Sequence, residues 1–152
     1  VLKEIKIEIQ NSKFNSEGYH DPTTYEAFMN IEREERAGGK SPNFRPVVFI
    51  CSPYAGDVTR NTENALRYCR MAYERGFLPI APHLYFPRFL NDNDSEERED
   101  GLFMGRVMLT KCSEMWVFGD TISSGMKREI EKAEDRRMPI RHFTTGGEEV
   151  RE

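Results

Sequence analysis

A buried strand, a polar turn and a helix follow one another between Met115 and Ala133, and this order constrains the fold most. Residues 115–118 read Met-Trp-Val-Phe, which favours a short strand covered on both faces. Small polar residues ending in Ser123-Ser124-Gly125 predict a tight turn before the helix. Such a unit is half of a βαβ motif, in which ligands collect at the carboxyl ends of the strands. The hydroxyls and the unpaired N–H groups at a helix start suit an anionic or polyhydroxylated ligand.

Glu129 stands out on this helix. At about 100° per residue, Met126, Ile130 and Ala133 form the apolar stripe, and Glu129 lies roughly 60° from Met126 at its edge. A carboxylate in this position commonly reaches solvent or pairs with a neighbouring Lys or Arg. The alternative is a carboxylate directed into a pocket next to the serine turn, and both interpretations stay open.

Other segments predict a complete α/β domain. We expect strands at 47–51, 77–81 and 140–143, and helices at about 59–75 and 95–111. Asp94-x-x-Glu97 is a capping signal for the second of these helices. Strands that alternate with helices require a parallel sheet covered on both faces. The predicted architecture is therefore a three-layer, doubly wound, flavodoxin- or Rossmann-like α/β fold over residues 45–144, followed by a C-terminal tail at 145–152.

The segment 1–44 is expected to be a separate N-terminal arm. Its first part alternates apolar and polar residues over 2–9, which favours an edge strand. Thr23-x-x-Glu26 then predicts a capped helix of about 14 residues that ends at Gly38-Gly39. The arm could cover a sheet edge or exchange with a partner chain.

Composition excludes several classes of function. The chain has 152 residues and a net charge of −4 without a Lys/Arg cluster, so we do not expect it to bind a nucleic-acid polymer. No apolar run approaches about 18 residues, and no secretory leader is evident, which predicts no membrane span. Three widely spaced cysteines indicate reduced thiols in a cytoplasmic protein. Cys51 ends a strand beside a loop, but a small core residue is the favoured role over a nucleophile.

Familiar cofactor and metal motifs are absent from the sequence. There is no G-x-G-x-x-G and no G-x-x-x-x-G-K, and an Asp92-x-Asp94-x-Glu96 run lacks the glycine that a calcium loop needs at its sixth position. The three histidines lack metal-ligand spacing, so we expect no metal and no cofactor. His83 follows the second strand at its carboxyl end. It is either a ligand-binding residue or a surface or capping residue.

Gly125, Glu129 and Ala133, spaced four apart after a strand and a serine turn, resemble the G-x-x-x-E-x-x-x-A helix of the nucleoside 2-deoxyribosyltransferase superfamily. That superfamily includes 2'-deoxynucleoside 5'-monophosphate N-glycosidases. Ser52-Pro-Tyr-Ala-Gly56 is similar to its opening substrate loop. The run 45–143 is similar to an uncharacterised branch found in bacteria, phages and mobile elements, through Ile50-Cys-Ser-Pro-Tyr, Pro79-Ile-Ala-Pro-His-Leu-Tyr-Phe-Pro and Trp116-Val-Phe-Gly-Asp.

The resemblance implies attack on an N-glycosidic bond with retention of configuration, with Glu129 as the nucleophile on C1' of the sugar. An ionised carboxylate stabilises an oxocarbenium-like transition state and can bond to it. A small nucleoside or nucleotide would be the ligand, and a homo-oligomer is implied because related sites are often completed by a neighbouring subunit. Tyr54, Tyr85 and Phe86 could stack on the base, or pack within their loop. The residues expected to bind substrate are Ser52, Tyr54, Gly56, His83, Tyr85, Ser123, Ser124 and Gly125.

The chain departs from this superfamily in its second acid. Related enzymes usually carry another carboxylate shortly before the nucleophile, whereas residues 123–128 contain none, and Asp120 is the candidate at the start of the turn. A further acid expected in the preceding helix has only Glu99 and Asp100 nearby. Two functions therefore stay open: N-glycosidic cleavage or deoxyribosyl transfer through Glu129, or a non-catalytic module that binds a nucleotide or a nucleotide signal for a mobile element.

Overall fold

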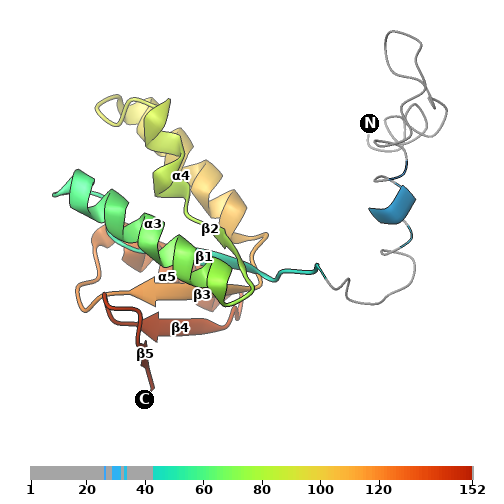
Figure 1. Ribbon diagram of the computed structural model, residues 1–152. Helices are drawn as coiled ribbons and strands as arrows, with labels where there is room; N and C mark the ends of the chain where they lie inside the picture. Colours follow the sequence, from blue (N-terminus) through green and yellow to red (C-terminus); the bar gives the residue numbers. More distant parts are fainter. Residues whose placement is uncertain (1–25, 27–28, 32, 34–42, 152) are drawn as a thin grey trace, which may run out of the picture. The chain divides into compact units, whose positions relative to one another are not determined.

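The computed structural model describes residues 26, 29–31, 33 and 43–151, and the chain divides into two units, Val1–Phe44 and Arg45–Glu152. In the first unit residues 26, 29–31 and 33 are helical, in the segment where the sequence predicts a helix after Thr23, whereas Asn43 and Phe44 are not. The strand predicted at 2–9, the cap at Thr23 and the helix end at Gly38-Gly39 lie outside the described residues. The rest of the fold concerns the second unit (Figure 1).

The second unit contains one five-stranded sheet in the order β2-β1-β3-β4-β5. β2, β1, β3 and β4 are parallel, whereas β5 runs antiparallel to β4. The interior strand β1 lies between β2 and β3 and places Phe49 opposite Ile80 on one side and Met115 on the other. The strands are β1 (Val47–Cys51), β2 (Leu78–Ile80), β3 (Glu114–Phe118), β4 (Ile140–Phe143) and β5 (Glu149–Val150). A continuous apolar run at the centre of a parallel sheet is what the sequence predicted.

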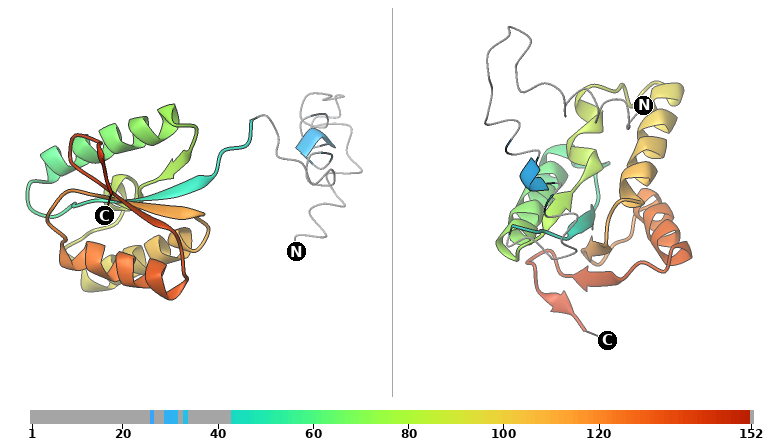
Figure 2. Two further views of the ribbon diagram at one scale, coloured as in Figure 1. Left: turned by 90° about the horizontal axis from the view of Figure 1, so that it is seen from below. Right: turned by 90° about the vertical axis from the view of Figure 1, so that its right-hand side faces the viewer.

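Helices cover both faces of the sheet, which confirms the doubly wound, three-layer α/β prediction (Figure 2). Val48 and Ile50 pack with Trp116, Phe118 and residues of α3 (Val58–Glu74) on one face. The alternate residues Phe49 and Cys51 pack on the other face, which α4 (Ser95–Leu109) and α5 (Ser124–Asp135) cover. Two short 3₁₀ helices, η1 (Pro82–Leu84) and η2 (Phe86–Arg88), connect β2 to α4. None of the described helices has the length and apolar composition of a membrane span.

Each of these α-helices begins at a side-chain cap. Asp57 caps α3. Asp94 caps α4, in the position that the sequence predicted. Glu97 does not close the capping box onto Asp94, because its carboxylate accepts the N–H of Asn91. At α5 the Ser123 hydroxyl accepts the N–H of Met126 at 3.2 Å, so Ser124 and Gly125 are already helical and the turn is shorter than expected.

Part of the segment predicted as a C-terminal tail belongs to the sheet. The chain turns at Gly147, whose φ is +87°, and β5 then pairs with β4. The guanidinium of Arg141 donates to both carboxylate oxygens of Glu149, at 2.9 and 2.8 Å, and so connects the two strands. Two residues are too few for a strand pattern, which explains why the sequence did not reveal β5.

Candidate active site

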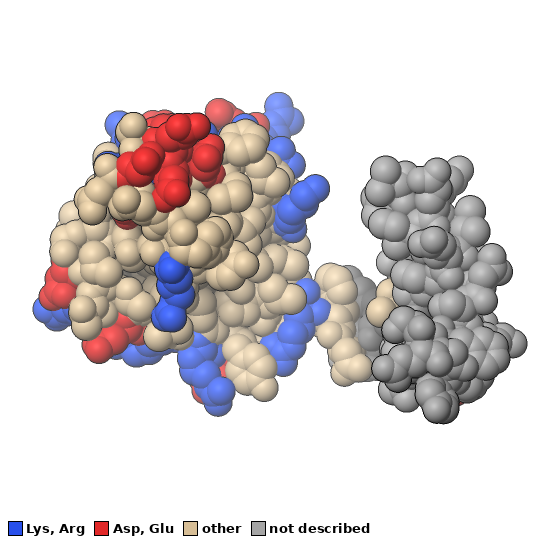
Figure 3. Space-filling view, turned by 90° about the horizontal axis from the view of Figure 1, so that it is seen from above, with Lys and Arg blue, Asp and Glu red and all other residues tan. Residues whose placement is uncertain are grey.

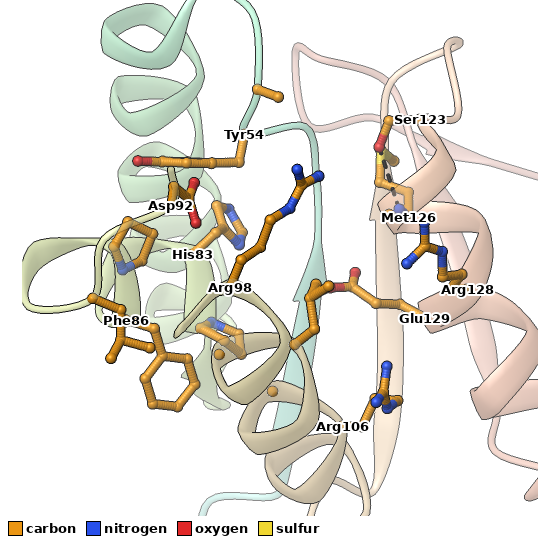
Figure 4. A pocket seen from close by; sticks show the side chains of 18 of the residues that line it. Tyr54, His83, Phe86, Asp92, Arg98, Arg106, Ser123, Met126, Arg128 and Glu129 are labelled. Atoms are coloured by element: carbon orange, nitrogen blue, oxygen red, sulfur yellow. Dashed lines mark hydrogen bonds between the residues drawn. The ribbon is translucent and has the colours of Figure 1, made fainter. Parts of the chain in front are cut away.

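The candidate site lies where the chain changes direction across the sheet. β1 and β3 are neighbours, yet β1 continues into α3 on one face and β3 into α5 on the other, so their loops diverge at the carboxyl ends. A cavity of about 240 Å³ opens there on the α4 and α5 side. Its walls come from the loop after β1, from η1 and η2, from α4 and from the start of α5 (Figure 4). A cavity of this size suits a small organic ligand.

Glu129 lines this cavity from the second turn of α5. Its side chain is partly buried, and no ion pair joins it to any Lys or Arg among the described residues. Burial raises the pKa of Glu129 to about 7, and a hydrogen bond from the Cys51 thiol lowers it in part. The carboxylate is therefore about half ionised at neutral pH. Solvent reaches it through the cavity, while protein surrounds it on the other sides.

Cys51 is the direct neighbour of Glu129 that the sequence did not reveal. It is fully buried at the end of β1, and its Sγ lies 3.9 Å from the carbonyl oxygen of Met126, one turn before Glu129. Burial and the nearby Glu129 carboxylate raise the pKa of the Cys51 thiol far above its usual range. Cys51 is thus an unreactive core thiol, as predicted, but one that also contacts the carboxylate.

A serine and a histidine meet on the opposite wall. The Ser52 hydroxyl, 6% exposed, lies 3.0 Å from Nε2 of His83, and both residues line the cavity. Burial lowers the pKa of His83 to about 4, so its imidazole is neutral at physiological pH. The ring of Tyr54 lies 6.4 Å from that of His83. His83 therefore faces the cavity from η1, rather than serving as a surface residue.

Ser123, Ser124 and Gly125 line the cavity at the start of α5. The Ser123 hydroxyl is occupied as the helix cap, as the dashed line in Figure 4 shows. The N–H groups of Ser124 and Gly125 lie in the first turn and have no acceptor among the described residues. The backbone, more than the serine hydroxyls, is thus available to an anion here.

Three arginines of the cavity wall were not predicted: Arg98 and Arg106 on α4, and Arg128 on α5. The signal for the α4 pair was present in the spacing, because residues 98, 101, 102, 105 and 106 repeat as one face of a helix. That face presents two arginines, two glycines and one leucine to the cavity.

Three of the predicted residues do not line this cavity. Gly56 lies in the loop after β1 with a φ of +95°, which suits glycine. Tyr85 is 60% exposed and packs against Phe86 and Phe89, so only Phe86 of the expected aromatic pair reaches the cavity wall. Asp120 lines a second hollow of about 230 Å³, which shares Ser52 with the first.

The carboxylates that line the first cavity besides Glu129 are those of Asp92 and Glu97. Neither Glu99 nor Asp100 belongs to its wall. Among the described residues no cluster of His, Cys, Asp and Glu could hold a metal ion. The exposed acids of the stretch 92–100 gather near the start of α4, and Figure 3 shows acidic side chains concentrated on that face.

The fold and the cavity together define an α/β protein with a cavity at the switch point of its sheet. Residues 46–143 match a family described as a domain of unknown function (DUF7768), and the chain belongs to this family. No curated protein matches the chain. Among solved structures, a 2-deoxyribosyltransferase from the psychrotolerant bacterium Bacillus psychrosaccharolyticus is similar, with a TM-score of 0.53 and 15% identity over 69% of this chain and 77% of that one. The chain thus has a 2-deoxyribosyltransferase-like fold.

Proposed function

We propose that this chain cleaves or transfers the N-glycosidic bond of a deoxynucleoside or deoxynucleotide, with Glu129 as the nucleophile. One observation carries the proposal: Glu129 is a partly buried carboxylate without an ion-pair partner among the described residues, on the wall of a cavity of about 240 Å³. The 2-deoxyribosyltransferase-like fold supports the same class of substrate. Perturbed acids in cavities are frequent in active sites.

The proposed reaction has two displacements. An ionised oxygen of Glu129 attacks C1' of the sugar, the C1'–N bond breaks, and its electron pair leaves with the base, which takes up a proton from water. Water or a second base then attacks C1' and gives up a proton to solvent, the bond between C1' and Glu129 breaks, and the released carboxylate leaves the original configuration restored. Ionisation is required for the first step, so activity on the acid side should follow the pKa of about 7.

His83 and Ser52 have a supporting role in this proposal. With a pKa of about 4, His83 is not charged at neutral pH and does not supply a proton to the leaving base as an imidazolium. The Ser52–His83 pair instead offers a neutral hydrogen-bonding wall opposite Glu129. Asp120 faces the second hollow, so we assign it no step in the chemistry.

The test is release of free base from the four common deoxynucleosides and their 5'-monophosphates. We expect release by the native chain, and a loss of at least about a thousandfold in Glu129→Gln, since the substitution removes the nucleophile. Glu131→Gln is the matched control, because Glu131 lies two residues away on α5 and is exposed. Equal rates in Glu129→Gln and the native chain would refute the role of Glu129. Tight binding without release would favour the non-catalytic nucleotide-binding module.

We further propose that the chain acts in the cytoplasm as a homo-oligomer. Cys51, Cys69 and Cys112 are free thiols, which a reducing compartment maintains. Phe103 and Val107 lie one turn apart on α4 and are 61% and 43% exposed, so they offer an apolar surface for self-association. Molar mass measured by light scattering tests the assembly.

A further inference from the structure

The loop after β1 separates the two hollows of the second unit. Tyr54 and Ala55 line the first cavity, Pro53 lines the second hollow, and the buried Ser52 lines both. In Figure 4 the ring of Tyr54 lies across the first cavity from Ser123 at the start of α5. The position of this short loop therefore sets the shape of one wall of the candidate site.

Asn61, in the first turn of α3, holds this loop through two hydrogen bonds. Its side-chain amide donates to the carbonyl oxygen of Tyr54 at 3.1 Å and to that of Ala55 at 3.0 Å. No other donor among the described residues bonds to either carbonyl. Both N–H groups of one amide are thus used on two consecutive peptide groups of the loop.

Packing alone does not fix the loop at this point. A hollow of about 230 Å³ lies on its other side, and Asn61 lines that hollow rather than the first cavity. The backbone hydrogen bond from Val58 to Gly56 lies further along the chain. The peptide groups of Tyr54 and Ala55 are therefore held by the Asn61 amide, and the loop has space to move into once that amide is removed.

We propose that Asn61 is a positioning residue of the candidate site: its amide keeps the loop after β1 in place, so that Tyr54 forms a wall against which the ligand binds. Asn61 acts through the loop, since it does not line the first cavity itself. The proposal rests on the proposed function for the identity of the ligand, and it adds how this wall is fixed. Tyr54 contacts the ligand before and during the reaction alike, so a displaced Tyr54 should weaken binding rather than slow the chemical step.

Asn61→Asp tests this role, because it keeps the size of the side chain and replaces both donors by an acceptor. A carboxylate in the first turn of a helix is favourable, so α3 itself should not be weakened. The substrate is whichever deoxynucleoside or 5'-monophosphate the native chain cleaves fastest. We expect KM to rise at least about tenfold and kcat to change by less than about threefold.

Asn64→Asp is the matched control. Asn64 also lines the second hollow from α3, but its Oδ1 accepts from the guanidinium of Arg67 at 2.9 Å, which a carboxylate continues to do. The same substitution one turn further along α3 should therefore leave KM within about twofold of the native value.

A double-substitution cycle tests whether Asn61 acts through Tyr54. Tyr54→Ala should raise KM at least as much as Asn61→Asp does, and the chain with both substitutions should have the KM of Tyr54→Ala. Asn61→Ala removes the same donors without adding a charge, so it should raise KM as Asn61→Asp does. The ¹⁹F NMR signal of fluorotyrosine at Tyr54, assigned with Tyr54→Phe, reports the loop without turnover. It should move in Asn61→Asp and not in Asn64→Asp.

An unchanged KM with an unmoved Tyr54 signal would overturn the proposal, as would a loss confined to kcat. Additive effects in the double variant, or a raised KM in Asn61→Asp that Asn61→Ala does not share, would also overturn it. Circular dichroism and urea unfolding of each variant show that a raised KM does not come from a lost fold. The proposed function fails separately: if the native chain releases no base, the Tyr54 signal and the calorimetric Kd of the monophosphates still test the role of Asn61.

Discussion

The raised pKa of Glu129 lowers the stability of the folded chain at neutral pH. Its pKa is about 7 in the fold against an ordinary value of 4.5, so between these values the folded chain holds more protons than the unfolded chain. Stability from this group therefore falls as the pH rises through that window and reaches its minimum above pH 7. A buried carboxylate that lowers stability at working pH, and that pairs with no described cation, is consistent with a functional role.

The Cys51 thiol should hold the pKa of the Glu129 carboxylate lower than burial alone would. Because the thiol hydrogen bond lowers the pKa of Glu129, Cys51→Ala should raise that pKa and move the acid limb of kcat/KM to higher pH. Activity at pH 6 should then fall roughly three- to tenfold, with a smaller change at pH 9. The pKa itself is measurable by ¹³C NMR titration of labelled glutamate, with Glu129→Gln to assign the signal.

Cys112→Ala is the matched control for that measurement. Cys112 belongs to the same buried cluster as Cys51. Its thiol donates a hydrogen bond to the carbonyl oxygen of Met108 at 3.4 Å, however, and it does not contribute to the pKa shift of Glu129. The Cys112→Ala substitution should lower the free energy of unfolding by about 1–2 kcal/mol because it leaves a cavity, and it should not move the Glu129 signal. Identical titration curves for native chain and Cys51→Ala would show that the thiol has no part in setting the carboxylate.

Helix α4 carries glycines on the face that lines the cavity. A Cβ added at Gly105 would lie 3.7 Å from Cβ of Pro82, an ordinary contact. Gly105→Ala should therefore stabilise the fold by about 0.5–1 kcal/mol, through the higher helix propensity of alanine. Urea unfolding measures this change.

The contrasting substitution is Gly147→Ala, in the turn that leads to β5. Gly147 has a φ of +87°, and an added Cβ would lie 2.7 Å from Sδ of Met71 on α3. Strain and overlap act together there, so we expect a loss of about 1–3 kcal/mol. A stabilised Gly147→Ala, or a destabilised Gly105→Ala, would contradict the positions of α3 and α4 described above.

Local signals account for what the sequence revealed of these elements. Apolar runs located β1 and β3, and Asp94 indicated the start of α4, since each signal lies within a few residues of the structure it specifies. The cavity is different, because it joins residues such as Ser52, His83, Arg98 and Glu129 that are far apart along the chain. Topology alone brought Ser52 and His83 to one sheet edge. The contact of Cys51 with Glu129 depends on how closely α5 packs on β1, which no periodicity encodes.

At the scale of the whole molecule, the core formed by the described residues lies within the second unit. Every buried hydrophobic residue of the described chain lies between Val48 and Phe143, and both clusters are built on the sheet. All residues that line the candidate site also lie in this part. We therefore propose the second unit from residue 45 on, β5 included, as the catalytic domain, with 1–44 as an arm that its core does not require.

Deleting residues 1–42 should accordingly leave the urea midpoint of the remaining chain nearly unchanged, with a free energy of unfolding within about 0.5 kcal/mol of that of the full chain. A chain that instead ends at Thr144 is the opposing control: it loses β5 and the Arg141–Glu149 pair, so its urea midpoint should be lower than that of the full chain. Base release by the first truncation should match that of the full chain if the cavity of one subunit suffices. A normal midpoint with lost release would instead assign the arm to the site, directly or through assembly, and the domain boundary at residue 45 would then separate two parts of one functional unit.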